Sequence, residues 1–208
     1  MTRLALAACV RLAGCIGLLW SLGPGTALAD PLADASRAFD AGDFFKAEKL
    51  YRALAQQGVA QAQFALGSMY DEGEGVMEDS RQALRWYRLA AAQGHLGAQT
   101  LLGAMYAFGQ GVDQDFAEAL RWDRLAAEQG GAAAQFQLGW LYQRGDGVAR
   151  DDARAHMWFS LAIAGAEAPQ RANVVRARDQ LEQRMTPVQI AAAQALERQC
   201  IASRFKGC

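Results

Sequence analysis

Apolar residues recur at helical spacing along most of this chain, and the pattern itself repeats with a period of 36 residues. A Leu-Gly pair and the tyrosine that follows it return in the same order at 66–70, 102–106 and 138–142. The alanines that keep this period are Ala47, Ala83, Ala119 and Ala155. A fixed period of roughly 20–50 residues is typical of stacked-repeat proteins. The spacing therefore predicts an all-α array of similar helix pairs.

Each full copy divides into two helices joined by a Gly-x-Gly-Val loop. The first helices are expected at about 60–72, 96–108 and 132–144, and the second at about 79–93, 115–129 and 151–165. Left-handed backbone favours glycine, so each first helix should end at the first glycine of its loop: Gly73, Gly109 or Gly145. Each second helix should follow an N-capping aspartate: Asp79, Asp115 or Asp151.

The two ends of the array differ from the full copies, as terminal repeats of a solenoid do. Two helices without the glycine loop are expected first, at about 32–41 and 44–57. Two longer helices should close the array, at about 170–184 and 186–203, the second beginning with a Thr-Pro-Val-Gln capping box. One domain is expected over 30–208, divided into a degenerate repeat at 30–58, full repeats at 59–94, 95–130 and 131–166, and closing helices at 167–208.

Small and aromatic residues inside the helices keep the same period. Gly67, Gly103 and Gly139 lie inside first helices, where glycine costs roughly 1 kcal/mol relative to alanine, so close contact with a neighbour is expected there. A stripe along the second helices should face the core, and it consists of Trp86, Trp122, Trp158, Leu89, Leu125 and Leu161. Because the tryptophans recur with the repeat, they are interpreted as core rather than as a cofactor site.

The first 29 residues have the pattern of a secretory signal peptide. Arg3 gives a basic start, 12–22 is an uncharged apolar run, and Ala27-Leu28-Ala29 has the small-x-small form of a cleavage site. Cleavage after Ala29 would leave residues 30–208 in the periplasm, with no membrane span. The alternatives are a lipid anchor on Cys15, within Leu-Ala-Gly-Cys, or an uncleaved anchor.

The charge of the chain bears on the class of partner, and its cysteines bear on disulfide formation. The formal net charge is −1, and no cluster of Lys or Arg is present, so nucleic acid and anionic lipid are not expected to bind. Cys9 and Cys15 would leave with the signal peptide. In an exported protein the remaining Cys200 and Cys208 are expected to form a disulfide. The alternatives are two free thiols or a CxxC-like redox role, against which the eight-residue spacing argues.

No residues form a recognisable catalytic, metal or cofactor site. His95 and His156 lack neighbours typical of a triad or a metal cluster, so both are interpreted as surface histidines. The Gly-x-Gly loops follow helices rather than strands, which favours turns over a phosphate cradle. The sequence therefore predicts that the protein is not an enzyme and has no cofactor.

The repeated motif closely resembles the Sel1-like repeat. In the second unit the matching residues are Ala83, Trp86, Tyr87, Ala90, Ala91, Gln93, Gly94, Ala98, Gln99, Leu102, Gly103, Tyr106, Gly109, Gly111, Val112 and Asp115. Leu50 stands where the first unit should have tryptophan, and Asp123 replaces the tyrosine in the third. The resemblance covers 43 to about 196. It implies a right-handed α/α solenoid related to tetratricopeptide repeats, which acts as a scaffold for protein contacts without catalytic residues.

Positions that vary between the copies mark a candidate binding face. They recur on one side of each first helix, and in tetratricopeptide-like proteins the first helices line the concave side. The expected groove consists of Phe64, Asp71, Glu72, Phe108, Phe136, Trp140 and Arg144. Exposed aromatic residues are common interaction hot spots. The alternative is that some of them, Phe64 and Phe136 above all, pack between repeats.

The resemblance and the N-terminal pattern together favour an exported scaffold that binds a protein or peptide partner of the cell envelope, as a periplasmic regulator or assembly factor. One alternative is a β-lactamase-like or other envelope hydrolase, as linked to cysteine-rich relatives. Those relatives carry a disulfide in each repeat, whereas this chain has no cysteine between Cys15 and Cys200. A second alternative is a lipid-anchored factor for polysaccharide export, which requires acylation of Cys15.

Overall fold

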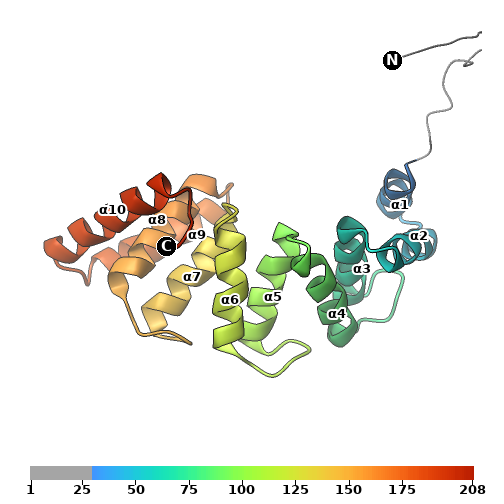
Figure 1. Ribbon diagram of the computed structural model, residues 1–208, viewed down its shortest axis with the longest axis horizontal. Helices are drawn as coiled ribbons and strands as arrows, with labels where there is room; N and C mark the ends of the chain where they lie inside the picture. The colour runs from blue at the N-terminus through green and yellow to red at the C-terminus, as the bar shows by residue number, and fades with distance from the viewer. Residues whose placement is uncertain (1–29) are drawn as a thin grey trace, which may run out of the picture.

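The computed structural model describes residues 30–208, which form ten α-helices and no strands (Figure 1). The helices are α1 Pro31–Asp40, α2 Phe44–Gln56, α3 Ala60–Glu72, α4 Ser80–Ala92, α5 Leu96–Phe108, α6 Phe116–Ala127, α7 Ala132–Arg144, α8 Asp152–Gly165, α9 Gln170–Glu182 and α10 Pro187–Ala202. The predicted all-α class is confirmed. The expected signal peptide and the alternative lipid anchor on Cys15 lie outside the described residues.

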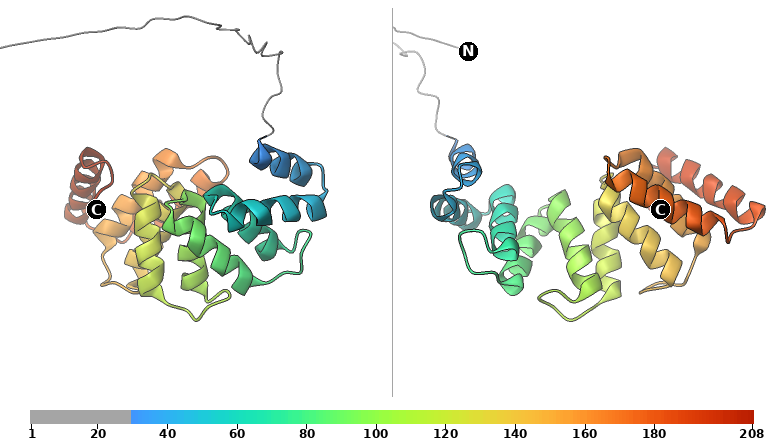
Figure 2. Two further views of the ribbon diagram at one scale, coloured as in Figure 1. Left: turned by 45° about the vertical axis from the view of Figure 1, so that its right-hand side comes forward. Right: turned by 180° about the vertical axis from the view of Figure 1, so that it is seen from behind.

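The helices stack in chain order into an elongated array. Each helix from α1 to α8 packs on the next, and α10 packs back on α8. The tightest pairs are α1 with α2, α3 with α4, α5 with α6, and α7 with α8. The array runs from α1 at one end to α9 and α10 at the other, and the same succession is seen from two further directions in Figure 2. Neighbour contacts therefore carry most of the core, as expected for a solenoid.

The predicted caps are present at both ends of the repeat helices. The side chains of Asp79, Asp115 and Asp151 accept hydrogen bonds from backbone N–H groups in the first turns of α4, α6 and α8. The first loop glycines, Gly73, Gly109 and Gly145, have φ angles of 71°, 70° and 79°. These local signals explain why the expected and observed helix bounds differ by only a few residues.

The second glycine of each loop is explained by close backbone contact. A Cβ atom on Gly111 would lie 2.6 Å from the carbonyl oxygen of Ser80, at the start of the preceding second helix. Gly75 and Gly147 approach the backbone of Phe44 and Phe116 in the same way. Each loop thus rests on the previous repeat, so its glycine pattern needs no bound ligand.

The glycines inside the first helices make room for side chains from the second helix of the same pair. A Cβ atom on Gly67 would lie 2.7 Å from the ring of Tyr87. Gly139 faces Phe159 in the same manner, and Gly103 faces the carboxylate of Asp123. The predicted close contact is confirmed, and each glycine marks a position where a side chain of the partner helix crosses the first helix.

Buried glutamines link successive repeats. The side-chain amide of Gln63 donates to the carbonyl of Ala55 at 3.1 Å, and Gln99 donates to Ala91 at 3.2 Å. Gln135 repeats the contact in the next copy. Because a buried amide needs partners, this ladder explains the glutamine of the motif structurally.

The predicted core stripe on the second helices is only partly correct. Trp158 and Trp122 are buried, whereas Trp86 is half-buried. Leu161 is buried, but Leu89 and Leu125 are exposed, so their assignment to the core was wrong. The physical reason is that α8 is also covered by α9 and α10, whereas α4 and α6 pack mainly against their neighbours in the stack.

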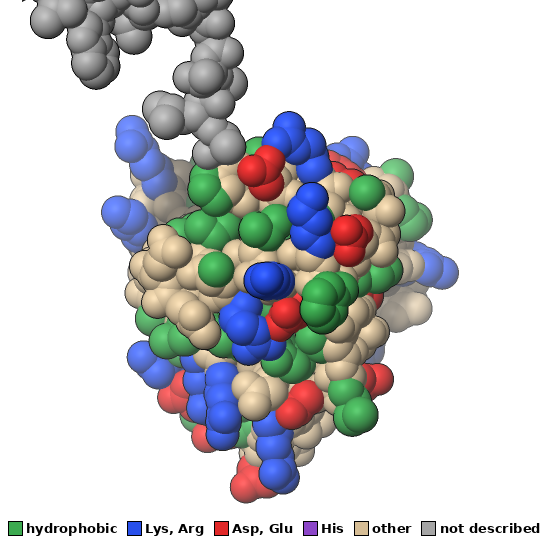
Figure 3. Space-filling view, turned by 90° about the vertical axis from the view of Figure 1, so that its right-hand side faces the viewer, with side chains coloured by type: hydrophobic (Ala, Val, Ile, Leu, Met, Phe, Trp, Pro, Cys, Tyr) green, Lys and Arg blue, Asp and Glu red, His purple; other side chains and the backbone are tan. Residues whose placement is uncertain are grey.

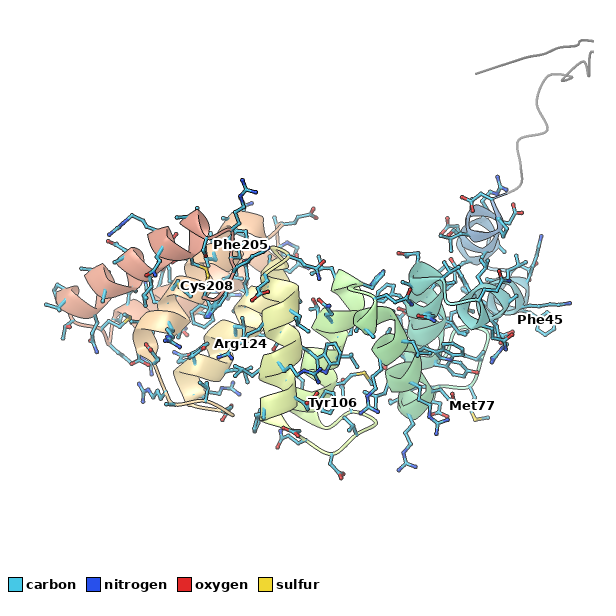
Figure 4. The ribbon with its side chains drawn as sticks, viewed as in Figure 1. Phe45, Met77, Tyr106, Arg124, Phe205 and Cys208 are labelled. Atoms are coloured by element: carbon cyan, nitrogen blue, oxygen red, sulfur yellow. A yellow bond between two sulfur atoms is a disulfide. The ribbon has the colours of Figure 1, made fainter. Side chains whose placement is uncertain are left out.

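The closing helices differ from expectation in length. α9 has 13 residues, the same as the repeat helices α3, α5 and α7, so it is not longer than they are. α10 has 16 residues and begins with the predicted capping box, in which Thr186 and Gln189 bond to each other's backbone N–H groups. Beyond α10, Phe205 and Cys208 turn back to line a small cavity with Arg124 of α6 (Figure 4).

A disulfide joins Cys200, which is buried near the end of α10, to Cys208. This pairing is the one predicted from the sequence. Replacing both cysteines by alanine should lower the free energy of unfolding by about 2–3 kcal/mol, because even a short closed loop restricts the unfolded chain. Urea denaturation followed by circular dichroism checks this, and an unchanged midpoint would show that the bridge adds no stability.

The surface and the helix lengths bear on possible partners. Within residues 30–208, none of the helices combines the length and the apolar character needed to cross a bilayer. At the N-terminal end of the array, acidic and basic side chains are interspersed rather than gathered by sign (Figure 3). This end of the molecule therefore offers no extended field that would attract a polyanion.

Candidate partner-binding cavity

Four of the seven predicted groove residues line one cavity of about 640 Å³ between α5, α6 and α7, termed here the α5–α7 cavity. They are Phe108, Phe136, Trp140 and Arg144. The remaining lining residues are Ala104, Ala107, Gln114, Phe116, Asp123, Gln137, Leu141 and Asp146. Its lining is mainly apolar with a few polar and charged side chains, which is the usual composition of a ligand-binding cavity.

Aromatic rings form one wall of the α5–α7 cavity. The rings of Phe136 and Trp140 lie edge to face with centroids 6.0 Å apart, and each also packs on Phe159, at 5.6 Å. The guanidinium of Arg144 lies over the Trp140 ring at 5.0 Å. Phe108, with 71% of its surface exposed, extends the apolar surface outward. Trp140 is half-buried, less open than expected.

The other three predicted groove residues lie on α3, outside this cavity. Phe64 is half-buried, with its ring stacked on His95 at 4.3 Å and tilted against Tyr87 at 5.7 Å. Asp71 is half-buried, and burial raises the pKa of its carboxyl group. Glu72 is exposed. The predicted face is therefore divided, with its larger hollow in the second half of the array.

Asp123 is the residue that the sequence reasoning left out of the site. It is completely buried, it lines the α5–α7 cavity, and neither carboxylate oxygen has a hydrogen-bond partner among the described residues. Burial raises the pKa of its carboxyl group well above the ordinary value. The available signal was the departure of Asp123 from the aromatic residue found at this position in the neighbouring copies.

Comparison of the copies explains why a cavity exists here. In α4, Tyr87 covers Gly67, and its hydroxyl donates to Ser68 at 3.3 Å. In α8, Phe159 covers Gly139. Asp123 occupies the same repeat position in α6 but is shorter than an aromatic ring, so the space above Gly103 is filled less completely. The departure at Asp123 thus contributes to the cavity, together with the small Ala104, which stands where the other copies have Ser68 and Trp140.

The two histidines differ from their predicted surface placement. His156 is buried, and its Nε2 atom lies 2.5 Å from a carboxylate oxygen of Glu182 on α9, so its assignment to the surface was wrong. The reason is its repeat position, which holds the buried residues Leu84 and Leu120 in the other copies. His95 is half-buried and caps α5 by accepting from Ala98 N–H, and burial lowers its pKa.

The α5–α7 cavity is suited to non-covalent binding. Its lining offers aromatic stacking, cation–π contact and hydrogen bonding, together with the charged groups of Arg144, Asp123 and Asp146. Over residues 30–208, no group of three or more His, Cys, Asp or Glu side chains is placed to hold a metal ion.

Comparison with known proteins identifies the repeat. The family model described as Sel1 repeat matches residues 60–95, 97–131 and 132–166, about half of the chain. Among solved structures, a Sel1 repeat protein from Oxalobacter formigenes is 32% identical, with a TM-score of 0.62, over 66% of this chain and 55% of that protein. No match was found among curated proteins.

A second similar structure is a protective antigen present in uropathogenic Escherichia coli strains and displaying an SLR fold. It is 29% identical, with a TM-score of 0.56, over 82% of this chain and 47% of that protein. The chain therefore spans about half the length of each of these two proteins. On the three matched repeats, the chain belongs to the Sel1 repeat family, whose members generally mediate protein–protein interactions and are generally not catalytic.

Proposed function

We propose that this protein is an exported interaction scaffold that binds a protein or peptide partner in the α5–α7 cavity. The observation that carries the proposal is the aromatic wall of Phe136 and Trp140 beside the exposed Phe108, on a fold used for protein contacts. Tryptophan and arginine are enriched among residues that dominate binding energy, and Trp140 and Arg144 occur here as a stacked pair.

Two features support an oxidising, extracytoplasmic location. The first is the N-terminal pattern of a signal peptide, and the second is the disulfide between Cys200 and Cys208. In a bacterial cell envelope the compartment in question is the periplasm. We infer a role there as a regulator or assembly factor that holds an envelope protein without turning it over.

Crosslinking in intact cells tests this proposal with a Phe108→Ala/Trp140→Ala variant. The variant should lose capture of its envelope partner by about 10-fold or more, because hot-spot aromatics typically contribute 2 kcal/mol or more each. A matched control is Phe45→Ala, since Phe45 is 78% exposed but lies on α2 at the far end of the array (Figure 4). Circular dichroism of the purified variants establishes that they are folded.

The outcomes separate the site from the scaffold. Loss of capture in the double variant, with full capture by Phe45→Ala, supports binding at the α5–α7 cavity. Equal capture by all three proteins would move the binding surface elsewhere on the array. Failure of the wild type to retain any envelope protein would contradict the scaffold function itself.

A further inference from the structure

We propose that the α5–α7 cavity takes up an arginine side chain of the partner protein, with its guanidinium group on the carboxylate of Asp123. This inference rests on the proposed function, because it names the chemical group by which the partner is recognised. It adds a specificity-determining residue, Asp123, to a surface otherwise described by its aromatic wall.

The first argument is the hydrogen-bonding capacity of Asp123. Asp123 belongs to the lining of the cavity, and both of its buried oxygens are without a partner among the described residues. Because a buried polar group without a partner is costly, this indicates a role outside the packing of the isolated chain. A guanidinium presents two parallel N–H groups that match the two oxygens of a carboxylate. A lysine ammonium is a point charge and lacks this paired geometry.

The second argument is the aromatic wall that shares the cavity lining with Asp123. The guanidinium group of arginine has a flat, weakly hydrated face that stacks on aromatic rings. The aliphatic part of the arginine side chain suits an apolar passage. Arg144 already places its guanidinium over Trp140 at 5.0 Å within this cavity. The wall is therefore of a kind that receives such a group, and the carboxylate of Asp123 in the same lining supplies the charge that it needs.

The other charged side chains of the cavity lining do not oppose an incoming guanidinium group. The lining includes one basic side chain, Arg144, and one further acidic side chain, Asp146, whose charges balance each other. Asp123 then supplies the remaining negative charge when its carboxyl group is ionised. Since Asp123 has no exposed surface, the incoming side chain has to displace half-buried neighbours such as Gln137 or Trp140.

Selection of peptides displays the preference directly. The purified chain, with its disulfide intact, is used to select from a phage-displayed library of random 12-residue peptides. Peptides enriched by the wild type should share an arginine, and their enrichment should require Phe108 and Trp140. The selected peptide is then synthesised with arginine and with citrulline, which has nearly the same shape but no charge.

The affinities of the two peptides for the wild type and for Asp123→Asn form a double-mutant cycle. On the wild type, citrulline should weaken binding by about 10-fold or more, the range expected for a lost charge-assisted pair. On Asp123→Asn the arginine peptide should lose a similar factor, and citrulline should then make little further difference. Asp113→Asn is the charge-matched control, because Asp113 is exposed in the neighbouring loop and does not line the cavity.

Each contrary result has a defined meaning. Peptides that bind through Phe108 and Trp140 but tolerate citrulline would overturn this inference and leave the proposed function standing. If Asp113→Asn lost as much affinity for the arginine peptide as Asp123→Asn, the effect would come from overall charge, and this result would also overturn the inference. If no peptide binds at the cavity, both proposals fail. Should Asp123→Asn not fold, Asp123→Phe, which copies Phe159, replaces it and should abolish the arginine preference.

Discussion

Replacing Trp158 by alanine is expected to lower the free energy of unfolding by about 3–5 kcal/mol, the range found when large aromatic residues are removed from a core. Trp158 is 2% exposed, because α8 is enclosed by α7, α9 and α10. Trp86 occupies the same repeat position on α4 but is only half-buried. Its replacement by alanine should therefore cost less than half as much.

Urea denaturation of the two variants measures this difference, with the loss of helix followed by circular dichroism in both. The comparison is matched because both positions carry tryptophan in the same repeat register, so only the surrounding helices differ. Equal losses for Trp86→Ala and Trp158→Ala would show that the closing helices do not contribute to the core of the last repeat. The stability would then depend on repeat position alone.

Helix bounds could be predicted from this sequence because their signals are local. An aspartate before α4 and a glycine after α3, for instance, cap those helices through their own side chain or backbone conformation. The same signals recur in each copy, so the helix bounds of one copy predict those of the other two. Comparison of the copies also pointed to Phe108, Phe136 and Trp140, which the structure places in one cavity lining; that a partner binds there stays a prediction.

Burial could not be predicted in the same way, because it depends on which helices cover a given face. Leu89 and Leu125 are exposed although Leu161, at the same repeat position, is buried beneath the closing helices. His156 illustrates the converse, since comparison with Leu84 and Leu120 would have placed it inside. The repeat position of a residue therefore predicts its burial, except at the end of the array, where the closing helices cover surfaces that are exposed in the other copies.

The cavity itself was the least predictable feature, because it arises from missing side-chain volume. The sequence shows Asp123 as a departure from an aromatic position, but the effect on packing depends on what crosses Gly103 in three dimensions. Where the aromatic is retained, as at Tyr87, the space is closed, and Phe64 packs into the contact instead of lining a hollow. The replacement of an aromatic residue by Asp123 is therefore one of the differences between copies that set where the face is hollow.

Replacing Asp123 by phenylalanine is expected to stabilise the protein by roughly 2–4 kcal/mol, while closing the α5–α7 cavity. The change removes a buried polar group without a partner, which costs about 1–3 kcal/mol, and adds apolar contacts like those of Phe159. Phenylalanine suits this position better than tyrosine, because Ala104 stands where Ser68 accepts from the Tyr87 hydroxyl. Lower stability of Asp123→Phe in urea would mean that the space cannot accept a ring.

The dependence of stability on pH separates the charge of Asp123 from its volume. Its pKa is raised by burial in the folded state, so above the unfolded value of about 4 the unfolded chain releases a proton that the folded chain retains. The free energy of unfolding should therefore fall as pH rises from about 4 towards the folded pKa. Asp123→Asn lacks this contribution, so its stability relative to wild type should increase over that range. Asp71, whose pKa is also raised, is present in both proteins and cancels. A constant difference between the two would mean that Asp123 has the same pKa in the folded and unfolded chains, and that its burial does not destabilise the carboxylate.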